Sequence, residues 1–372
     1  MALSRDFPVR QGRGREGVAS LRRTDSDTAW REKTRQGQTG LVRCFLKADD
    51  ILKKTWLAVL LTAIITALFT AAALSAGAAY VAGCYFIDLA LKRGTADNPD
   101  APPAIFRTAI EGNGRAIRPA PKPDFDSESW TLRSFDGLAL RATHFEPEQD
   151  SRRWVLLLHG YGLTQAHVWS YASAYLAHGY HVVTPDLRAS GTSEGVYTTM
   201  GALESRDAAD WARRIISADP NARIVLHGVS MGAAAVMLAA GEKDLPANVS
   251  AVVEDSGYAN IYDLFAIELD KLLSLPAYPL LDAADFVCER RAGFSFRQAS
   301  PIESVRRSRL PILFIHGTAD RLVPFSMMQA LYEASPSPTK ETLVIDKVGH
   351  GVLYQAKNYF PTVFRFTEKW TE

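Results

Sequence analysis

The chain has 372 residues, of which 47% are hydrophobic and 22% charged, and its formal net charge is +1. A length above that of a typical single domain predicts one large domain with appendages, and the apolar content suits a packed core. The nearly neutral charge gives no electrostatic reason to expect nucleic acid or a strongly acidic partner. Three cysteines are too few for a disulfide framework or a cysteine-based zinc site.

The first 54 residues form a basic and polar segment. They contain 13 Lys and Arg against seven Asp and Glu, with few apolar residues and no sustained period. This composition predicts a disordered basic tail over 1–54.

An apolar run without any charged residue follows, from Trp56 to Ile87. Its length of about 30 residues exceeds the roughly 20 that a transmembrane helix needs, so we expect one such helix over 55–88. A cleaved signal peptide has a shorter apolar region and a short basic lead, and a buried core helix does not stay uncharged for so long. The positive tail favours a cytoplasmic N-terminus and an extracytoplasmic domain after the helix.

A proline-rich segment then leads into alternating elements. We expect 89–128 to form an extended linker that holds the next domain off the bilayer. Short strand candidates over 130–133 and 138–145 are joined by a hairpin signal, Asp136-Gly137. Beyond them, apolar strand candidates alternate with helices: 154–158, 181–184, 223–226, 251–254, 311–315 and 342–345. This order predicts an α/β domain over 129–372 with a mostly parallel, doubly wound sheet, whose active site lies beyond the C-terminal ends of the strands.

One strand end carries a candidate nucleophile, Ser230. It is the centre of Gly228-Val-Ser-Met-Gly232, which follows the strand candidate 223–226 and opens a helix of small residues. A G-x-S-x-G turn between strand and helix exposes the serine hydroxyl, and the helix N-terminus favours negative charge beside it. Ser193 is the centre of a second match, but it lies in a polar loop without a following helix, so we interpret it as a turn residue.

Several motifs in this order resemble those of the α/β-hydrolase family, in particular its serine aminopeptidase-like and monoacylglycerol-lipase-like branch and its membrane-anchored bacterial members with a small helical cap. The motifs are Leu158-His-Gly-Tyr-Gly162, Pro185-Asp-Leu-Arg188, Gly228-Val-Ser-Met-Gly232, His316-Gly-Thr-Ala-Asp-Arg-Leu-Val-Pro324 and Gly349-His-Gly351. The sequence departs from the D-x-R-G-H-G that relatives often carry, since Arg188 is followed by Ala189-Ser190-Gly191. The resemblance covers about 129–371 and implies the α/β-hydrolase fold.

A serine nucleophile needs a base and a carboxylate that orients the base. In this fold they follow the serine as acid and then histidine, which favours His350 as the base and Asp320 as the acid, with Asp255 as the alternative acid. We interpret His316 as a structural residue at the end of a strand.

Two backbone N–H groups are expected to bind the developing oxyanion. Met231, directly after the nucleophile, is the first, and Tyr161 is the second by resemblance. We expect a structural role for His159, and we expect Asp186 and Arg188 to hold the neighbouring loop.

Residues 257–309 interrupt the alternation and predict a short helical cap, some of whose aromatic residues line an apolar pocket. Asp263, Glu268 and Asp270 are interpreted as a solvated acidic face, with binding of a substrate amine as the alternative.

The sequence thus predicts a membrane-anchored serine hydrolase that cleaves an ester, thioester or amide of a small molecule or short peptide, without metal or other cofactor. The alternatives are a cofactor-free lyase or perhydrolase and a non-catalytic membrane-tethered binding protein. The sequence identifies neither the substrate nor the oligomeric state.

Overall fold

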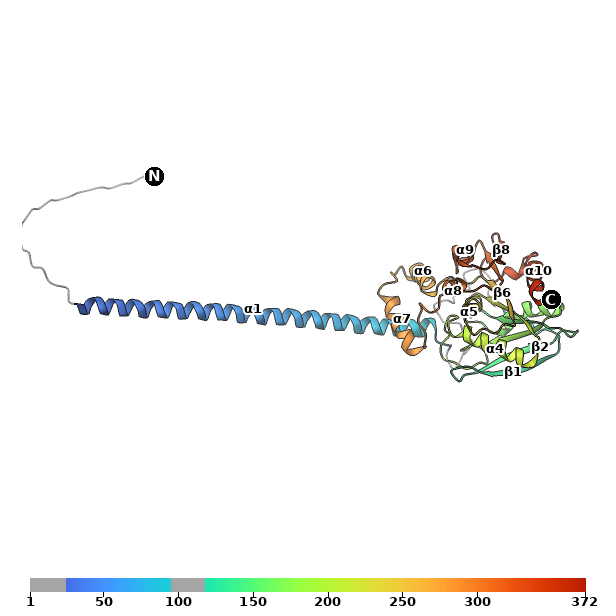
Figure 1. Ribbon diagram of the computed structural model, residues 1–372, viewed down its shortest axis with the longest axis horizontal. Coiled ribbons are helices and arrows are strands. Elements are labelled where there is room, and N and C mark those ends of the chain that lie inside the picture. Colours follow the sequence, from blue (N-terminus) through green and yellow to red (C-terminus); the bar gives the residue numbers. More distant parts are fainter. Residues whose placement is uncertain (1–24, 95–117) are drawn as a thin grey trace, which may run out of the picture. The chain divides into compact units, whose positions relative to one another are not determined.

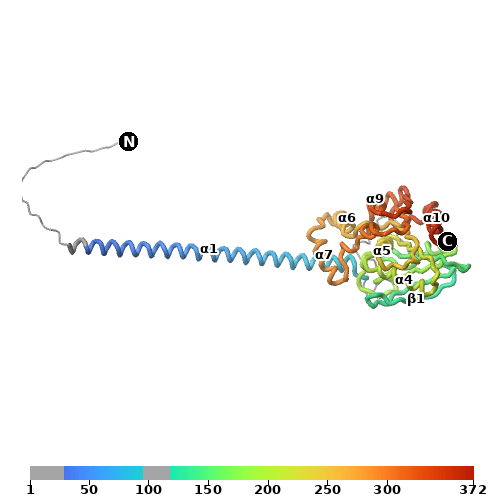
Figure 2. Tube along the Cα trace, in the orientation of Figure 1, coloured from blue at the N-terminus to red at the C-terminus, as the bar shows by residue number. Residues whose placement is uncertain are grey.

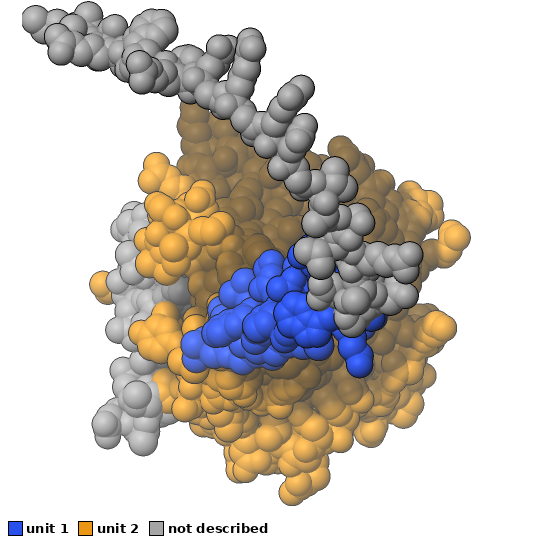
Figure 3. All heavy atoms as spheres, turned by 90° about the vertical axis from the view of Figure 1, so that its left-hand side faces the viewer, with its two compact units in different colours: residues 1–74 blue, residues 75–372 orange. Residues whose placement is uncertain are grey.

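The computed structural model describes residues 25–94 and 118–372. It contains two compact units, residues 1–74 and 75–372, which Figure 3 shows in different colours.

Helix α1 (Asp25–Ala90) runs through the described part of the first unit and continues into the second (Figure 1). Over Ala29–Ala90 it is long and apolar enough to cross a membrane by length and composition. The disordered tail expected over 1–54 is therefore wrong from Asp25 onward. Residues of good helix propensity populate this part, and Lys53 and Lys54 pair with acidic residues one turn earlier. Residues 1–24 lie outside the described range.

The second unit is built on one eight-stranded sheet in the order β1-β2-β4-β3-β5-β6-β7-β8. The strands are β1 (Ser127–Arg133), β2 (Ala139–Phe145), β3 (Arg153–Leu158), β4 (His181–Asp186), β5 (Arg223–Val229), β6 (Val249–Asp255), β7 (Ile312–Gly317) and β8 (Glu341–Ile345). Strand β2 pairs antiparallel with β1 and β4, and the remaining pairs are parallel. The sheet confirms the predicted doubly wound α/β architecture. The inner strands are buried on both faces, which explains their continuous apolar runs.

Helices cover both faces of the sheet and enclose two hydrophobic cores. One core includes residues of α4 (Glu204–Ala218), α5 (Met231–Ala240), α8 (Pro301–Val305) and α9 (Phe325–Ala334). The other lies under α3 (Trp169–Ala177) and α10 (Tyr359–Thr371). Helix α5 lies centrally, against β3, β5 and β6 (Figure 2).

The chain between β6 and β7 forms the expected helical cap, with α6 (Ile261–Leu273) and α7 (Leu280–Arg291). Its aromatic core includes Phe265 and Phe296, which pack edge to face at 5.0 Å. Asp263 and Asp270 are exposed, as an acidic surface requires. Glu268 is instead buried, with Lys271 Nζ 2.8 Å from its Oε1.

The last turns of α1 are part of the second unit and pack into it. Phe86, Ile87 and Leu91 are buried in the core shared with the cap. The N–H of Arg93 donates to the Val196 carbonyl, and the N–H of Thr198 donates to the Leu91 carbonyl. The expected linker over 89–128 is therefore wrong at its start, because apolar side chains fix this segment to the domain. Residues 95–117 lie outside the described range.

Candidate active site

Ser230 stands on a strained turn between β5 and α5. Its φ of 57° and ψ of −117° are unusual for a residue other than glycine. The turn requires its two glycines: a Cβ at Gly228 would lie 2.1 Å from the Gly232 carbonyl oxygen, and one at Gly232 would lie 2.2 Å from that of Leu158. The turn therefore lifts the half-buried Ser230 hydroxyl above the sheet.

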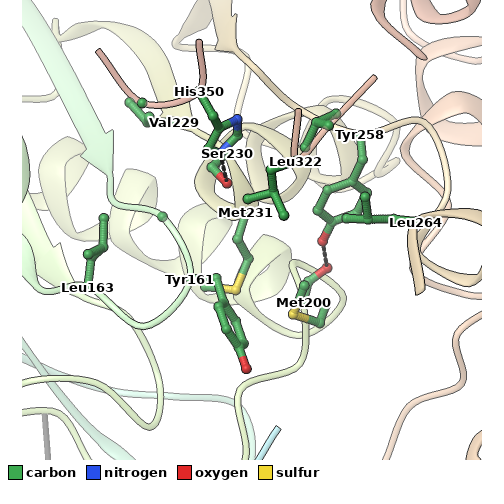
Figure 4. A pocket seen from close by; sticks show the side chains of 13 residues that line it. Tyr161, Leu163, Met200, Val229, Ser230, Met231, Tyr258, Leu264, Leu322 and His350 are labelled. Carbon is green, nitrogen blue, oxygen red and sulfur yellow. Dashed lines mark hydrogen bonds between the residues drawn. The ribbon is translucent and has the colours of Figure 1, made fainter. Parts of the chain in front are cut away.

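The structure brings Ser230, His350 and Asp320 into one hydrogen-bonded line. His350 Nε2 lies 2.8 Å from Ser230 Oγ, and His350 Nδ1 lies 2.7 Å from Asp320 Oδ2 (Figure 4 shows the first contact). Because the carboxylate only accepts, Nδ1 carries the proton and donates it, which leaves Nε2 to accept from the serine hydroxyl. These residues follow the ends of β5, β7 and β8, which meet at the same edge of the sheet.

Asp320 is held as an anion in a buried position. Its other oxygen, Oδ1, accepts the backbone N–H groups of Leu322 and Val323, each at 2.9 Å. Burial alone raises the pKa of the carboxyl group, but the charge of His350 and hydrogen bonds from His316 and His350 outweigh burial and hold this pKa well below its usual value.

The same coupling acts on His350 in the opposite direction. Burial lowers the pKa of the imidazole, but the charge and the hydrogen bond of Asp320 outweigh it, so the pKa of His350 is raised. A base of this kind takes up a proton readily when the hydroxyl beside it loses one.

The two predicted oxyanion donors flank Ser230. Met231 begins α5, so its N–H belongs to the first turn, where helix N–H groups have no intrahelical acceptor. Tyr161 follows β3 in the loop that approaches Ser230 from the other side: a Cβ at Gly160 would lie 3.3 Å from Ser230 Cβ. The Tyr161 hydroxyl points away from the serine and donates to the Ala90 carbonyl at the end of α1 (Figure 4).

A narrow apolar pocket adjoins the serine. Its lining includes Leu163, Met200, Tyr258, Leu264 and Leu322, beside Ser230 and His350 (Figure 4). Only about 40 Å³ of it is open to the centre of a water-sized sphere, against roughly 300–1,000 Å³ for a typical small-molecule pocket. Among the aromatic residues of the cap, Tyr258 lines this pocket, whereas Phe265 and Phe296 fill the core of the cap.

The other serine, acid and histidine considered from the sequence make contacts outside the proposed triad. Ser193 is buried and donates to the Asp186 carbonyl at 2.6 Å, as expected of a turn residue. Asp255 accepts the Tyr359 hydroxyl at 2.7 Å and the Ser256 hydroxyl at 2.8 Å. His316 Nε2 lies 3.0 Å from the Val323 carbonyl, so it supports the loop that carries Asp320.

The loops around the site are fixed by buried polar groups. His159 accepts the Leu187 N–H at Nε2 and donates through Nδ1 to the Gly160 carbonyl, and burial lowers its pKa to about 4, so this link is neutral. Asp186 accepts from both the backbone and the side chain of Gln165 and of Thr192. Arg188 pairs with Asp207 at 2.7 Å and with Asp136 at 2.9 Å. His159, Asp186 and Arg188 all have the structural roles expected from sequence.

Sequence reasoning missed the loop that carries Met200. The buried Glu204 carboxylate accepts the N–H groups of Thr199 and Gly201 at 2.8 and 2.9 Å, and the Tyr258 hydroxyl donates to the Met200 carbonyl at 2.6 Å. An acid just inside a helix N-terminus, after two threonines, is the signal that could have indicated this arrangement.

One group of potential metal ligands occurs among the described residues, formed by Glu128, His144 and Glu146 near β1 and β2. His144 already has partners at both nitrogens, Glu128 Oε1 and His181 Nδ1, each at 3.2 Å. We therefore interpret this group as part of the sheet surface and assign no metal to it.

Comparison with known proteins identifies the family of the chain. The profile described as "Alpha/beta hydrolase family" matches residues 155–361. The chain is 28% identical over 252 residues to the uncharacterized protein YqkD of Bacillus subtilis, covering 66% of this chain and 81% of YqkD. It is 26% identical over 230 residues to the uncharacterized protein YfhR of Escherichia coli K12, covering 60% of this chain and 74% of YfhR.

Solved structures share the fold. The Pyrococcus furiosus esterase Pf2001 aligns with a TM-score of 0.56 and 21% identity, over 68% of this chain and 99% of its own. A Pyrococcus horikoshii acylaminoacyl peptidase aligns with a TM-score of 0.51 and 17% identity, over 67% of this chain and 42% of its own. With the family profile matched over more than half of its length, the chain belongs to the alpha/beta hydrolase family and is a hydrolase.

Proposed function

We propose that the protein is a serine hydrolase that cleaves a carboxylic ester, thioester or amide through an acyl-enzyme on Ser230. The observation that carries this proposal is the line of hydrogen bonds from Ser230 Oγ through His350 to Asp320, at 2.8 and 2.7 Å. A serine hydroxyl is a weak nucleophile until a base accepts its proton, and this line supplies the base and its orienting carboxylate.

In the first half-reaction, neutral His350 Nε2 takes the proton of Ser230 Oγ while the oxygen attacks the substrate carbonyl carbon. The N–H groups of Met231 and Tyr161 stabilise the negative charge that develops on the carbonyl oxygen. His350, now an imidazolium beside Asp320, gives its proton to the departing alcohol, thiol or amine, and the acyl group stays on Ser230.

In the second half-reaction, His350 takes a proton from water, whose oxygen attacks the acyl carbon. The tetrahedral intermediate collapses, the carboxylic acid leaves, and the proton returns to Ser230 Oγ. Loss of one oxyanion donor in such sites typically lowers the rate by about 10²–10³.

The narrow pocket favours a short acyl group. The centres of water-sized spheres have only about 40 Å³ of room beside Ser230, well below the roughly 300–1,000 Å³ of a typical small-molecule pocket. The lining is apolar apart from the reacting groups, so a short acyl chain suits the pocket better than a long one, and Leu264 of α6 borders the space that a longer chain would take.

Labelling with a fluorophosphonate tests the proposed nucleophile. We expect wild type to label and Ser230→Ala to lose labelling, because the probe reacts with an activated serine. Ser193→Ala is the matched control, since Ser193 is the centre of the other G-x-S-x-G match and its hydroxyl is bonded to the Asp186 carbonyl. Equal labelling of Ser230→Ala and wild type, or no labelling of a folded wild type, would refute the proposal and favour the non-catalytic or lyase alternatives.

We further propose that α1 anchors the protein in a membrane with the hydrolase domain on the extracytoplasmic side. The uncharged run from Trp56 to Ile87 and the positive charge before it support this orientation. In intact cells, external protease should digest the domain while the N-terminal segment stays protected. Digestion only after permeabilisation would reverse the orientation, and release of the protein without detergent would refute the anchor.

A further inference from the structure

We propose that the cap tip, formed by Leu272, Leu273, Leu275, Tyr278 and Phe286, inserts into the headgroup layer of the bilayer that α1 crosses. This inference rests on the proposed transmembrane span. The named partner is the lipid bilayer itself, and the argument starts from the contact between α1 and α7.

The end of α1 leaves no spacer between the apolar run and the cap. A Cβ at Gly77 would have no neighbour within 4 Å, whereas a Cβ at Gly83 would lie 2.8 Å from the Ala283 carbonyl oxygen of α7. Phe86 packs edge to face on Phe265 of α6 at 5.6 Å. Within the second unit, the end of the uncharged run is therefore in direct contact with the cap from Gly83 onward.

An ion pair fixes this contact. Asp88, the first charged residue after the run, lies 3.0 Å from an Arg291 nitrogen of α7 and accepts the Tyr197 hydroxyl at 3.0 Å. The polar end of the span is thus joined to α7, and the cap cannot move far from the membrane surface without breaking these bonds.

The length of the exposed run places this contact at the interface. At about 1.5 Å per residue, the helix from Trp56 to Ala82 is about 40 Å long. A bilayer measures roughly 30 Å across its hydrocarbon core and about 40–45 Å with the headgroup regions. The turns of α1 around Gly83, and with them α7, accordingly lie where the headgroups are.

The side chains of the cap tip suit that layer. Leu273, Tyr278 and Phe286 are 55%, 75% and 49% exposed, although burial of each would be favourable. Tyrosine is a preferred residue at membrane interfaces. The Arg290 guanidinium lies 3.3 Å from the centre of the Phe286 ring. A positive charge that can pair with lipid phosphate groups therefore lies beside an apolar side chain.

The exposed turns of α1 continue this apolar surface. Tyr80, Val81 and Tyr85 flank the Gly83 contact and are 46%, 67% and 71% exposed. Phe286 lies on α7, which touches α1 at Gly83, and the other residues of the cap tip lie at the end of α6 and in the segment that joins α6 to α7. The cap tip and these turns of α1 therefore contact the same surroundings, which are the lipids around α1.

Site-directed fluorescence in the full-length protein tests the insertion. Tyr278→Cys and Leu273→Cys are labelled with an environment-sensitive fluorophore in a Cys44→Ser background, because Cys44 is the exposed native cysteine of the described chain. The protein is reconstituted in phosphatidylcholine–phosphatidylglycerol vesicles. Nitroxide lipids with the spin label near the headgroup or deep in the acyl chain serve as membrane quenchers, and iodide serves as the aqueous quencher.

Two reference positions make the outcomes separable. Phe69→Cys reports the centre of the span, where Phe69 is 74% exposed, and Val344→Cys reports an exposed apolar side chain on β8, outside the cap, at 43%. We expect the shallow nitroxide to quench the Tyr278 and Leu273 probes several-fold more than the Val344 probe, and iodide to quench them several-fold less.

Iodide quenching of the cap probes equal to that at Val344, with the Phe69 probe quenched by the deep nitroxide, would overturn the insertion and leave the anchor intact. Iodide quenching at Phe69 would overturn the anchor and the insertion together. The thermal midpoint of each labelled variant must match that of the Cys44→Ser background. Iodide quenching of a cap probe then reflects its exposure to water in the folded protein and not unfolding of the cap.

Discussion

Replacing Asp320 by asparagine tests whether this residue orients His350 for proton transfer or only fills space beside it. The substitution keeps the shape of the side chain but changes what each terminal atom can do. Oδ1 of Asp320 accepts two backbone N–H groups, from Leu322 and Val323, at 2.9 Å. An asparagine must keep its carbonyl oxygen on these two donors, since its amide group would otherwise face two N–H groups.

The amide nitrogen of the new side chain would then face His350 Nδ1, at the place of the oxygen now 2.7 Å away. Because the amide donates, Nδ1 must accept, so the imidazole proton moves to Nε2 and points at the Ser230 hydroxyl. The base is thereby in the wrong tautomer to take the serine proton. The same exchange in a serine protease lowers kcat by about 10⁴, which corresponds to about 5.4 kcal/mol of transition-state stabilisation.

The assay is hydrolysis of p-nitrophenyl acetate, followed as kcat/KM for wild type, Asp320→Asn and Asp255→Asn. We expect a loss of about 10³–10⁴ for Asp320→Asn with little change in the thermal midpoint. Asp255→Asn is the matched control, because this buried residue, the alternative acid from sequence, receives hydroxyl groups from Tyr359 and Ser256. The reasoning is refuted if Asp320→Asn stays within about tenfold of wild type, or if Asp255→Asn alone, while folded, abolishes activity.

Three further outcomes are expected. Burial lowers the pKa of His350, but Asp320 raises it more strongly, so this pKa lies above its ordinary value of about 6.5. Because His350 must be neutral to act as the base, kcat/KM should fall as the pH drops through this raised pKa. A pH profile checks this, and a fall in kcat/KM that begins only below about pH 6.5 contradicts it. Leu264→Ala should widen the pocket and raise the ratio of kcat/KM for p-nitrophenyl hexanoate over acetate; an unchanged ratio in the folded variant would place the acyl group elsewhere. Arg188→Met should lower the free energy of unfolding by about 3–5 kcal/mol, because it leaves the buried Asp207 carboxylate without its partner at 2.7 Å; urea denaturation measures it, and a loss below about 1 kcal/mol would show that the pair is dispensable.

Local patterns in the sequence predicted much of the hydrolase domain. The strand candidate 223–226 and the helix after it become β5 and α5, and the glycines around Ser230 occupy positions where a Cβ would collide with a carbonyl oxygen. These features depend on residues close together in the chain, so spacing and composition are enough to predict them. The same holds for His159 and Arg188, whose structural roles follow from their place at strand ends.

Other features depended on contacts between distant segments. Sequence favoured Asp320 as the acid and kept Asp255 as the alternative, and only the packing of β7 and β8 places the Asp320 carboxylate 2.7 Å from His350. The 89–94 segment was interpreted as linker because its composition carries no sign of what it touches. The tail after Asp25 was misjudged because low hydrophobicity does not by itself prevent a helix of good formers.

What the sequence determined alone was the chemistry available: the elbow serine, one histidine in a glycine-flanked loop, acids at strand ends, and an uncharged run long enough to cross a bilayer. The tertiary structure decided which of these groups meet. It joined Ser230 to His350, set a pocket of about 40 Å³ beside them, and packed the end of α1 on the cap. The physical reason is that hydrogen bonds and close packing act over a few ångströms in space, whatever the separation along the chain.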